Sequence, residues 1–129
     1  MTRTILSIED ASSFRQLMRV ALEFEGFSVV EAQSGASGLA LAFSMKPDLI
    51  LLDVKLPDTN GLTLCKTILA DKDLHLIPIV MLSSSNDEAQ IVAGIQAGAK
   101  GYLVKPFYPR ELVALAHRLI PNSIEGSMH

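Results

Sequence analysis

The sequence predicts an α/β fold in which one parallel sheet is covered by helices on both faces. Short apolar, β-rich segments alternate along the chain with segments whose apolar residues recur at helical spacing, five of each. Such alternation is typical of strand–helix–strand units, which are joined by right-handed crossovers and build parallel sheets. A chain of 129 residues with 49% hydrophobic content suits one core, which leaves no room for a second domain.

The expected strands are short, apolar and rich in β-branched residues. They cover residues 4–8, 27–32, 48–53, 77–82 and 101–104. The third is apolar between two aspartates, as expected of a central strand that is covered on both faces. Asp53 therefore stands at the end of the most buried strand.

The expected helices begin and end at ordinary capping and stop signals. They run from Ser12 or Ser13, which can cap the first helix, to Gly26, from Ser34 to Met45, from Gly61 to Leu69, from Asn86 to Ala97, and from Pro109 until Pro121 stops the last one. Cys65 lies within the apolar pattern of the third helix, and this position favours buried packing over catalysis.

Composition excludes several classes of function. With 11 basic and 14 acidic residues the formal charge is −3, which argues against direct nucleic-acid binding. A single cysteine cannot form an internal disulfide, and no stretch approaches the ~20 apolar residues of a membrane span. A cytoplasmic location without a membrane partner fits best. Residues 1–120 are expected to form the domain, and 121–129 a disordered tail, the start of a linker or a cloning remnant.

Polar residues gather where the expected strands end, and the carboxyl ends of an open parallel sheet are where ligands bind. These residues are Glu9 and Asp10 after the first strand, Asp53 after the third, Ser83 after the fourth and Lys105 after the fifth. Crowded carboxylates repel one another unless a cation compensates, and oxygen ligands without Cys or His favour Mg²⁺ or Mn²⁺. A carboxylate nucleophile, a metal, a lysine and a hydroxyl are the parts that phosphoryl transfer requires.

The order of these motifs resembles the receiver domains of two-component response regulators over about residues 4–120. The matching motifs are Glu9-Asp10, Leu-Leu-Asp53-Val-Lys-Leu-Pro57, Gly61, Met-Leu-Ser83-Ser84 and Gly-Tyr102-Leu-Val-Lys105-Pro106-Phe107. The resemblance implies a flavodoxin-like, doubly wound fold, with a five-stranded parallel sheet in the order 2-1-3-4-5 and five flanking helices.

The resemblance also implies a phosphoacceptor site. Asp53 would accept a phosphoryl group from the phosphohistidine of a histidine kinase or a histidine phosphotransfer protein. Mg²⁺ would be bound by Asp10, Asp53 and the backbone carbonyl of Lys55. Glu9, which replaces the commoner aspartate, would act through water, although its longer arm can instead reach the metal. The chain would assist its own phosphorylation and dephosphorylation without being an enzyme on another substrate.

The remaining implied roles concern the phosphorylated state. Ser83 would bind a phosphoryl oxygen, Lys105 would form an ion pair with it, and the Lys105-Pro106 bond would be cis. Tyr102 would either swing inward as a switch of the helix 4, strand 5 and helix 5 face or simply pack there. The partner reading this face would be an output domain or a downstream protein, and the chain itself a monomer or weak dimer.

Two further positions and two other classes of function complete the hypotheses. Lys55 lies two residues after Asp53 and Ser85 two residues after Ser83, which suggests that they tune the lifetime of the phosphorylated state.

A degenerate receiver that binds a partner without phosphorylation would lack Asp53, Asp10 or Lys105, and all three are present. A hydrolase on the same sheet would need an acid where Lys55 stands, and a flavin-binding protein would need a phosphate-cradling loop at Glu9-Asp10.

Overall fold

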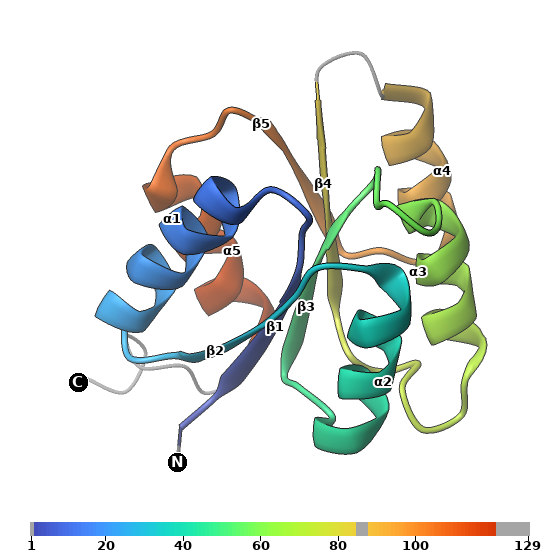
Figure 1. The fold of residues 1–129 in the computed structure, drawn as a ribbon, viewed down its shortest axis with the longest axis horizontal. Helices are drawn as coiled ribbons and strands as arrows, with labels where there is room; N and C mark the ends of the chain where they lie inside the picture. The colour runs from blue at the N-terminus through green and yellow to red at the C-terminus, as the bar shows by residue number, and fades with distance from the viewer. Residues whose placement is uncertain (1, 85–87, 121–129) are drawn as a thin grey trace.

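The structure, a computed structural model, describes residues 2–84 and 88–120. One parallel sheet in the order β2-β1-β3-β4-β5 forms its centre (Figure 1), as predicted. The strands are β1 (Thr4–Ile8), β2 (Ser28–Ala32), β3 (Leu49–Asp53), β4 (Ile79–Ser84) and β5 (Gly101–Lys105). The helices are α1 (Ser12–Phe24), α2 (Gly35–Met45), α3 (Gly61–Ala70), α4 (Glu88–Ala97) and α5 (Pro109–Leu119). The predicted tail at 121–129 lies outside the described residues.

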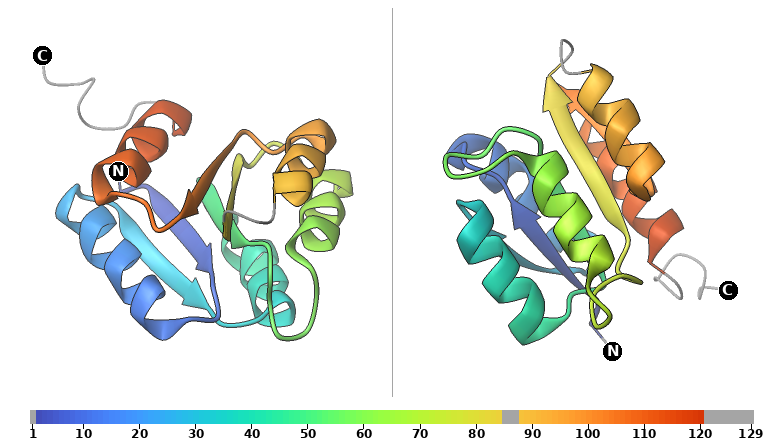
Figure 2. Two further views of the ribbon diagram at one scale, coloured as in Figure 1. Left: turned by 90° about the horizontal axis from the view of Figure 1, so that it is seen from above. Right: turned by 90° about the vertical axis from the view of Figure 1, so that its right-hand side faces the viewer.

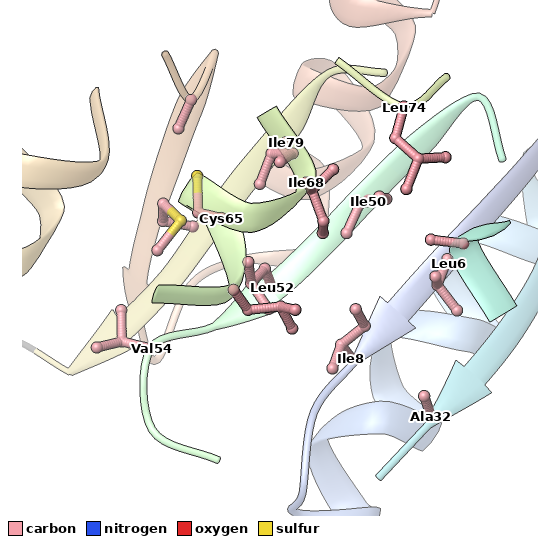
Figure 3. Packing of buried hydrophobic residues seen from close by; sticks show 14 residues of the cluster. Leu6, Ile8, Ala32, Ile50, Leu52, Val54, Cys65, Ile68, Leu74 and Ile79 are labelled. Atoms are coloured by element: carbon pink, nitrogen blue, oxygen red, sulfur yellow. The ribbon is translucent and has the colours of Figure 1, made fainter. Parts of the chain in front are cut away.

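Helices cover both faces of the sheet, with α1 and α5 on one face and α2, α3 and α4 on the other (Figures 1 and 2). Alternate residues of β3 point to opposite faces, because side chains alternate along a strand. Ile50 and Leu52 therefore pack toward α3 (Figure 3), whereas Leu49 and Leu51 pack toward α1 and α5. Cys65 is fully buried in the first of these clusters, which confirms the packing role predicted for it.

Several predicted boundaries differ from the structure, and those of α1 and β4 matter most for the site. The predicted start of the fourth helix, Asn86, lies outside the described residues. Neither Ser12 nor Ser13 caps α1, because Ser12 is already helical and the capping position falls on Ala11, which offers no side-chain acceptor. Strand β4 also begins later and ends later than predicted, since the Ile77 amide closes a turn onto Leu74 instead of joining the sheet. Ser83 consequently lies inside β4 rather than after it, paired with Val104 of β5.

The strand ends converge because all five strands run in one direction. Figure 1 shows the carboxyl ends of β1, β3, β4 and β5 at one edge of the sheet. Within residues 2–84 and 88–120, no helix is long and apolar enough to cross a membrane.

Candidate functional site

Three charged side chains from three strand ends meet at this edge of the sheet. The Lys105 ammonium, at the end of β5, lies 2.7 Å from Glu9 Oε1 and 3.2 Å from Asp53 Oδ1. Glu9 follows β1 and Asp53 ends β3, so these contacts join segments that are far apart in the sequence. We call these three residues the Glu9–Lys105–Asp53 cluster.

Both carboxylates of the cluster are withdrawn from solvent. Glu9 is 1% exposed and Asp53 is 7% exposed. The second oxygen of Glu9 accepts a hydrogen bond from the Ala11 amide at 3.1 Å, while the Glu9 amide donates to the Ala32 carbonyl of β2. Glu9 is thus held by the backbone on both sides, with its carboxylate turned inward toward Lys105.

The cluster carries two carboxylates and one ammonium, and the pKa of Asp53 is raised by burial and by the second carboxylate. Burial raises the pKa of Asp53 from its ordinary 3.8 to about 6, the Glu9 carboxylate adds to the rise, and the Lys105 ammonium opposes it. A buried carboxylate beside a like charge is stabilised by any further cation. The cluster therefore has the electrostatics of a cation-binding site.

The Phe14 ring also contacts Lys105. The Lys105 ammonium lies 4.8 Å from the centre of this ring, a distance at which a cation is attracted to the ring face. Phe14 in turn packs edge-on against Phe107, with ring centres 5.1 Å apart. The Lys105–Pro106 peptide bond, directly before Phe107, is cis. The sequence gave no sign of the contact between Phe14 and Lys105.

A buried arginine, which the sequence prediction missed, supports the turn after β1. Arg15 is 8% exposed, and its Nη1 donates to the carbonyl oxygens of Glu9 at 2.8 Å and of Asp10 at 2.9 Å. One signal was available, because Arg15 lies three and seven residues before Met18 and Leu22, on the face of α1 that is buried. A charged residue on a buried helix face is unusual unless it is paired.

The loop from β3 to α3 is held by an aspartate that the sequence prediction also missed. The Asp58 carboxylate accepts hydrogen bonds from the amides of Gly35 at 2.8 Å and Ala36 at 2.9 Å, in the first turn of α2. These bonds lower the pKa of Asp58 below its ordinary value. Lys55, whose carbonyl is a predicted metal ligand, is in the same loop and forms a backbone bridge with Asn60.

The other predicted residues lie at different distances from the cluster. Asp10 is exposed next to Glu9 and lines a surface hollow with Ser34, Ser37 and Pro57, among others. Ser83 is 1% exposed and its hydroxyl donates to the Ser84 carbonyl at 2.8 Å. Tyr102 is half exposed on β5, away from the charged cluster. Lys55 is exposed, and Ser85 lies outside the described residues.

The residues present fit a Mg²⁺ ion. Among the described residues, no three His, Cys, Asp or Glu side chains gather closely enough to form a complete metal cage. Mg²⁺ does not require such a cage, because it retains several waters and binds through one or two carboxylates. Asp10, Asp53 and the Lys55 carbonyl offer only oxygen donors, and the excess negative charge beside Asp53 favours a cation there.

Comparison with known proteins identifies the family. The family model of the response regulator receiver domain matches residues 5–117. The chain belongs to this family. It is 41% identical over 112 residues to the phosphate regulon transcriptional regulatory protein PhoB of Pseudomonas aeruginosa, an alignment that covers 87% of this chain and 49% of PhoB. It is also 37% identical over 123 residues to the transcriptional regulatory protein ResD of Bacillus subtilis, covering 95% of this chain and 50% of ResD.

Solved receiver structures share the fold along their whole length. The chemotaxis response regulator CheY4 of Vibrio cholerae superposes with a TM-score of 0.85 and 30% identity, covering 92% of this chain and 99% of CheY4. A CheY-like response regulator receiver domain protein of Methanospirillum hungatei gives a TM-score of 0.87 and 27% identity, covering 98% of this chain and all of that one. The chain spans about half the length of the curated relatives that it matches. It is therefore a receiver domain of the kind found in two-component response regulators.

Proposed function

We propose that this receiver accepts a phosphoryl group on Asp53 from the phosphohistidine of a histidine kinase or of a histidine phosphotransfer protein. The observation that carries the proposal is the buried Asp53 carboxylate, 3.2 Å from the Lys105 ammonium and beside a second buried carboxylate. An Asp53 oxygen attacks phosphorus, the phosphorus–nitrogen bond breaks, and its electron pair returns to the imidazole. Asp10, Asp53 and the Lys55 carbonyl would hold Mg²⁺, which would supply neutralising charge for the phosphoryl oxygens.

Lys105 and Ser83 respond to the new phosphoryl group. Phosphorylation converts the Asp53 carboxylate into an acyl phosphate, whose transferred phosphoryl oxygens carry the negative charge, so the Lys105 ammonium gains a stronger partner next to the one it already contacts. The Ser83 hydroxyl donates to Ser84 in the present arrangement, and it must turn away from that carbonyl to donate to a phosphoryl oxygen. Glu9 keeps Lys105 at the site in both states through its 2.7 Å contact.

The signal leaves through the face formed by α4, β5 and α5. Tyr102 lines a groove of about 410 Å³ with apolar residues of α4 and β5, which include Ile91, Val92, Ile95 and Val104. Movement of Ser83 opens space for the Tyr102 ring to turn inward, and this reshapes the groove that an output domain or a partner protein reads. The receiver assists its own phosphorylation and dephosphorylation and transforms no other substrate.

Phosphorylation by a small donor tests this function. With acetyl phosphate and Mg²⁺ the wild-type chain should gain the mass of one phosphoryl group, and Asp53→Asn should gain none. Asp73→Asn, which changes an exposed aspartate after α3, is the matched control and should label like wild type. Labelling of Asp53→Asn at the wild-type level would remove the proposal.

The switch has a separate test. Backbone NMR shifts on phosphorylation should extend from Asp53 to α4 and Tyr102. Shifts confined to the neighbourhood of Asp53 would leave phosphorylation intact as a function and exclude the Tyr102 mechanism.

A further inference from the structure

Arg15 is a buried cation for which the proposed chemistry has no direct use. Its side chain is only 10% exposed, and it contacts neither Asp53 nor Lys105 in any hydrogen bond or ion pair of residues 2–84 and 88–120. Burial of a guanidinium is unfavourable unless its partners compensate. The partners that compensate here indicate what the residue does.

The first partners are two consecutive backbone carbonyls. Strand β1 ends at Ile8, so Glu9 and Asp10 lie beyond the register pairs that β1 makes with β2 and β3. Arg15 Nη1 donates to both of their carbonyls, at 2.8 and 2.9 Å. The Arg15 amide also donates to the Ala11 carbonyl at 3.0 Å. One residue of α1 thus fixes three successive peptide groups of the turn that carries the acidic pair.

The second partner is a carboxylate on the neighbouring strand. Glu31 of β2 places Oε1 3.7 Å from Arg15 Nε, and its other oxygen lies 2.9 Å from Arg19 Nε. The contact of Arg15 with Glu31 is an ion pair and not a hydrogen bond, because the buried Arg15 Nε has no hydrogen-bond partner among the described residues. Glu31 offsets part of the charge of Arg15, and it shares this role with Arg19, which contacts the same carboxylate.

We infer that Arg15 is a positioning residue that sets the Mg²⁺ affinity of the receiver by fixing the Glu9–Asp10 turn, without contacting the metal or the phosphoryl group. The inference rests on the proposed Mg²⁺-assisted phosphorylation of Asp53. Two effects of Arg15 oppose each other, since its charge repels a divalent cation while its hydrogen bonds hold the ligands in place. Positioning prevails because Glu31 offsets part of the charge, whereas among residues 2–84 and 88–120 no other group is recorded as donating to the Glu9 and Asp10 carbonyls.

The signs of these two effects provide the test. Arg15→Met keeps an unbranched apolar side chain but removes both the donors and the charge, and Arg15→Lys keeps the charge without the planar fork. The matched control is Arg19→Met, which also loses a contact with Glu31 but touches neither carbonyl. For each full-length variant, the rate of phosphorylation by acetyl phosphate is measured against Mg²⁺ concentration, and Mg²⁺ binding is followed separately by thermal stabilisation.

Positioning requires a specific pattern of results. In Arg15→Met the Mg²⁺ concentration for half-maximal rate should rise about tenfold, with the rate at saturating Mg²⁺ within about twofold of wild type. Arg15→Lys should shift in the same direction by a smaller factor, and Arg19→Met should match wild type. Without metal, hydrogen exchange at the Ala11 amide, which donates to Glu9 Oε2, should accelerate in Arg15→Met, accelerate less in Arg15→Lys and stay at the wild-type rate in Arg19→Met.

The opposite outcomes overturn the inference. Unchanged or tighter Mg²⁺ binding in folded Arg15→Met would mean that charge, or neither effect, dominates. If Arg15→Met does not fold, Arg15→Lys decides alone, and wild-type Mg²⁺ dependence in that variant overturns the inference. A wild-type chain that is not phosphorylated at any Mg²⁺ concentration would instead remove the proposed function, and the inference with it.

Discussion

The two loops that bring acidic residues to the site are fixed in contrasting ways. The turn from β1 to α1, which carries Glu9 and Asp10, is held from inside by the buried Arg15 guanidinium. The loop from β3 to α3 is held at its outer side by its own exposed Asp58, whose carboxylate accepts hydrogen bonds from the first amides of α2. At the end of this loop, Gly61 lies close to the backbone of Asp53 and Val54. The first loop therefore depends on buried charge, and the second on backbone shape and a solvated cap.

Gly61→Ala should have the largest effect, because backbone shape has no room to adjust there. The Gly61 amide donates to the Val54 carbonyl at 2.6 Å, and an added Cβ would collide with the Asp53 carbonyl and lie 2.7 Å from Val54 Cα. Neither contact is a flexible side chain, so the start of α3 must move. We expect a loss of about 3 kcal/mol in unfolding free energy, measured by chemical denaturation.

The control for Gly61→Ala is Thr63→Ala, an exposed change on the same helix that should cost much less. Phosphorylation by acetyl phosphate should also slow in Gly61→Ala, because the displaced backbone belongs to Asp53. If Gly61→Ala were as stable as Thr63→Ala, backbone shape would not be what fixes the second loop.

Asp53→Asn should stabilise the metal-free protein at neutral pH. The pKa of Asp53 is raised from 3.8 to about 6 by burial, with Glu9 adding to the rise, so the folded state binds more protons than the unfolded state between these values. Unfolding free energy must therefore fall as the pH rises through this window. The shift corresponds to about 3 kcal/mol, which solvent screening at the rim of the site lowers to about 2 kcal/mol.

Chemical denaturation in EDTA from pH 4 to pH 7 measures this effect. Asp53→Asn removes the fall of the unfolding free energy with rising pH, while Lys105 keeps its 2.7 Å contact with Glu9. The difference between Asp53→Asn and wild type should grow as the pH rises and level off above pH 7. Asp73→Asn is the control. Parallel stability curves for wild type and Asp53→Asn would show that the cluster already balances its own charge without a metal.

Lys55→Ala should shorten the lifetime of the phosphorylated state. Lys55 is exposed at the start of the second loop, two residues after Asp53, and a side chain over the phosphoryl group excludes the water that hydrolyses it. If the Lys55 charge stabilised the ground state and the transition state of hydrolysis equally, the hydrolysis rate would not change. Exclusion of water by the Lys55 side chain, in contrast, slows hydrolysis. We expect decay about tenfold faster, or ~1.4 kcal/mol of barrier, in excess Mg²⁺. Lys72→Ala is the control, and slower or equal decay in Lys55→Ala would exclude occlusion.

The sequence predicted the side-chain contacts that follow from strand topology, and it missed the hydrogen bonds that side chains make with backbone groups. The meeting of Glu9, Asp53 and Lys105 follows from parallel strands ending at one edge, so it was predictable once the strands were located. Arg15 and Asp58 instead bind carbonyls and amides that are left without partners at a strand end and a helix start. Side-chain patterns do not record which backbone groups are left over. Only Arg15, as a charge on a buried helix face, left a readable trace.

The smallest effect, and the sharpest contrast with Asp53, is expected at Asp58. The amides of Gly35 and Ala36 lower the pKa of the Asp58 carboxylate, so the stability it contributes is present above pH 3.8 and is lost as the pH falls through its folded value. Asp58→Asn keeps one acceptor but loses the charge that is favourable at a helix N-terminus, and Asp58→Ala loses the charge and both acceptors.

In EDTA, Asp58→Ala should therefore be less stable than Asp58→Asn, and both should be less stable than wild type, by amounts smaller than the change at Asp53. Their deficits should grow as the pH rises from the lowered folded pKa of Asp58 through 3.8 and then level off, whereas Asp53→Asn gains stability over its own, higher window. Two aspartates five residues apart, one at the end of β3 and the other in the loop that follows, would thus titrate with opposite consequences for folding, because one is buried beside a like charge and the other is solvated against amide donors. Deficits at Asp58 that do not change with pH would mean that its hydrogen bonds to α2 do not depend on its charge.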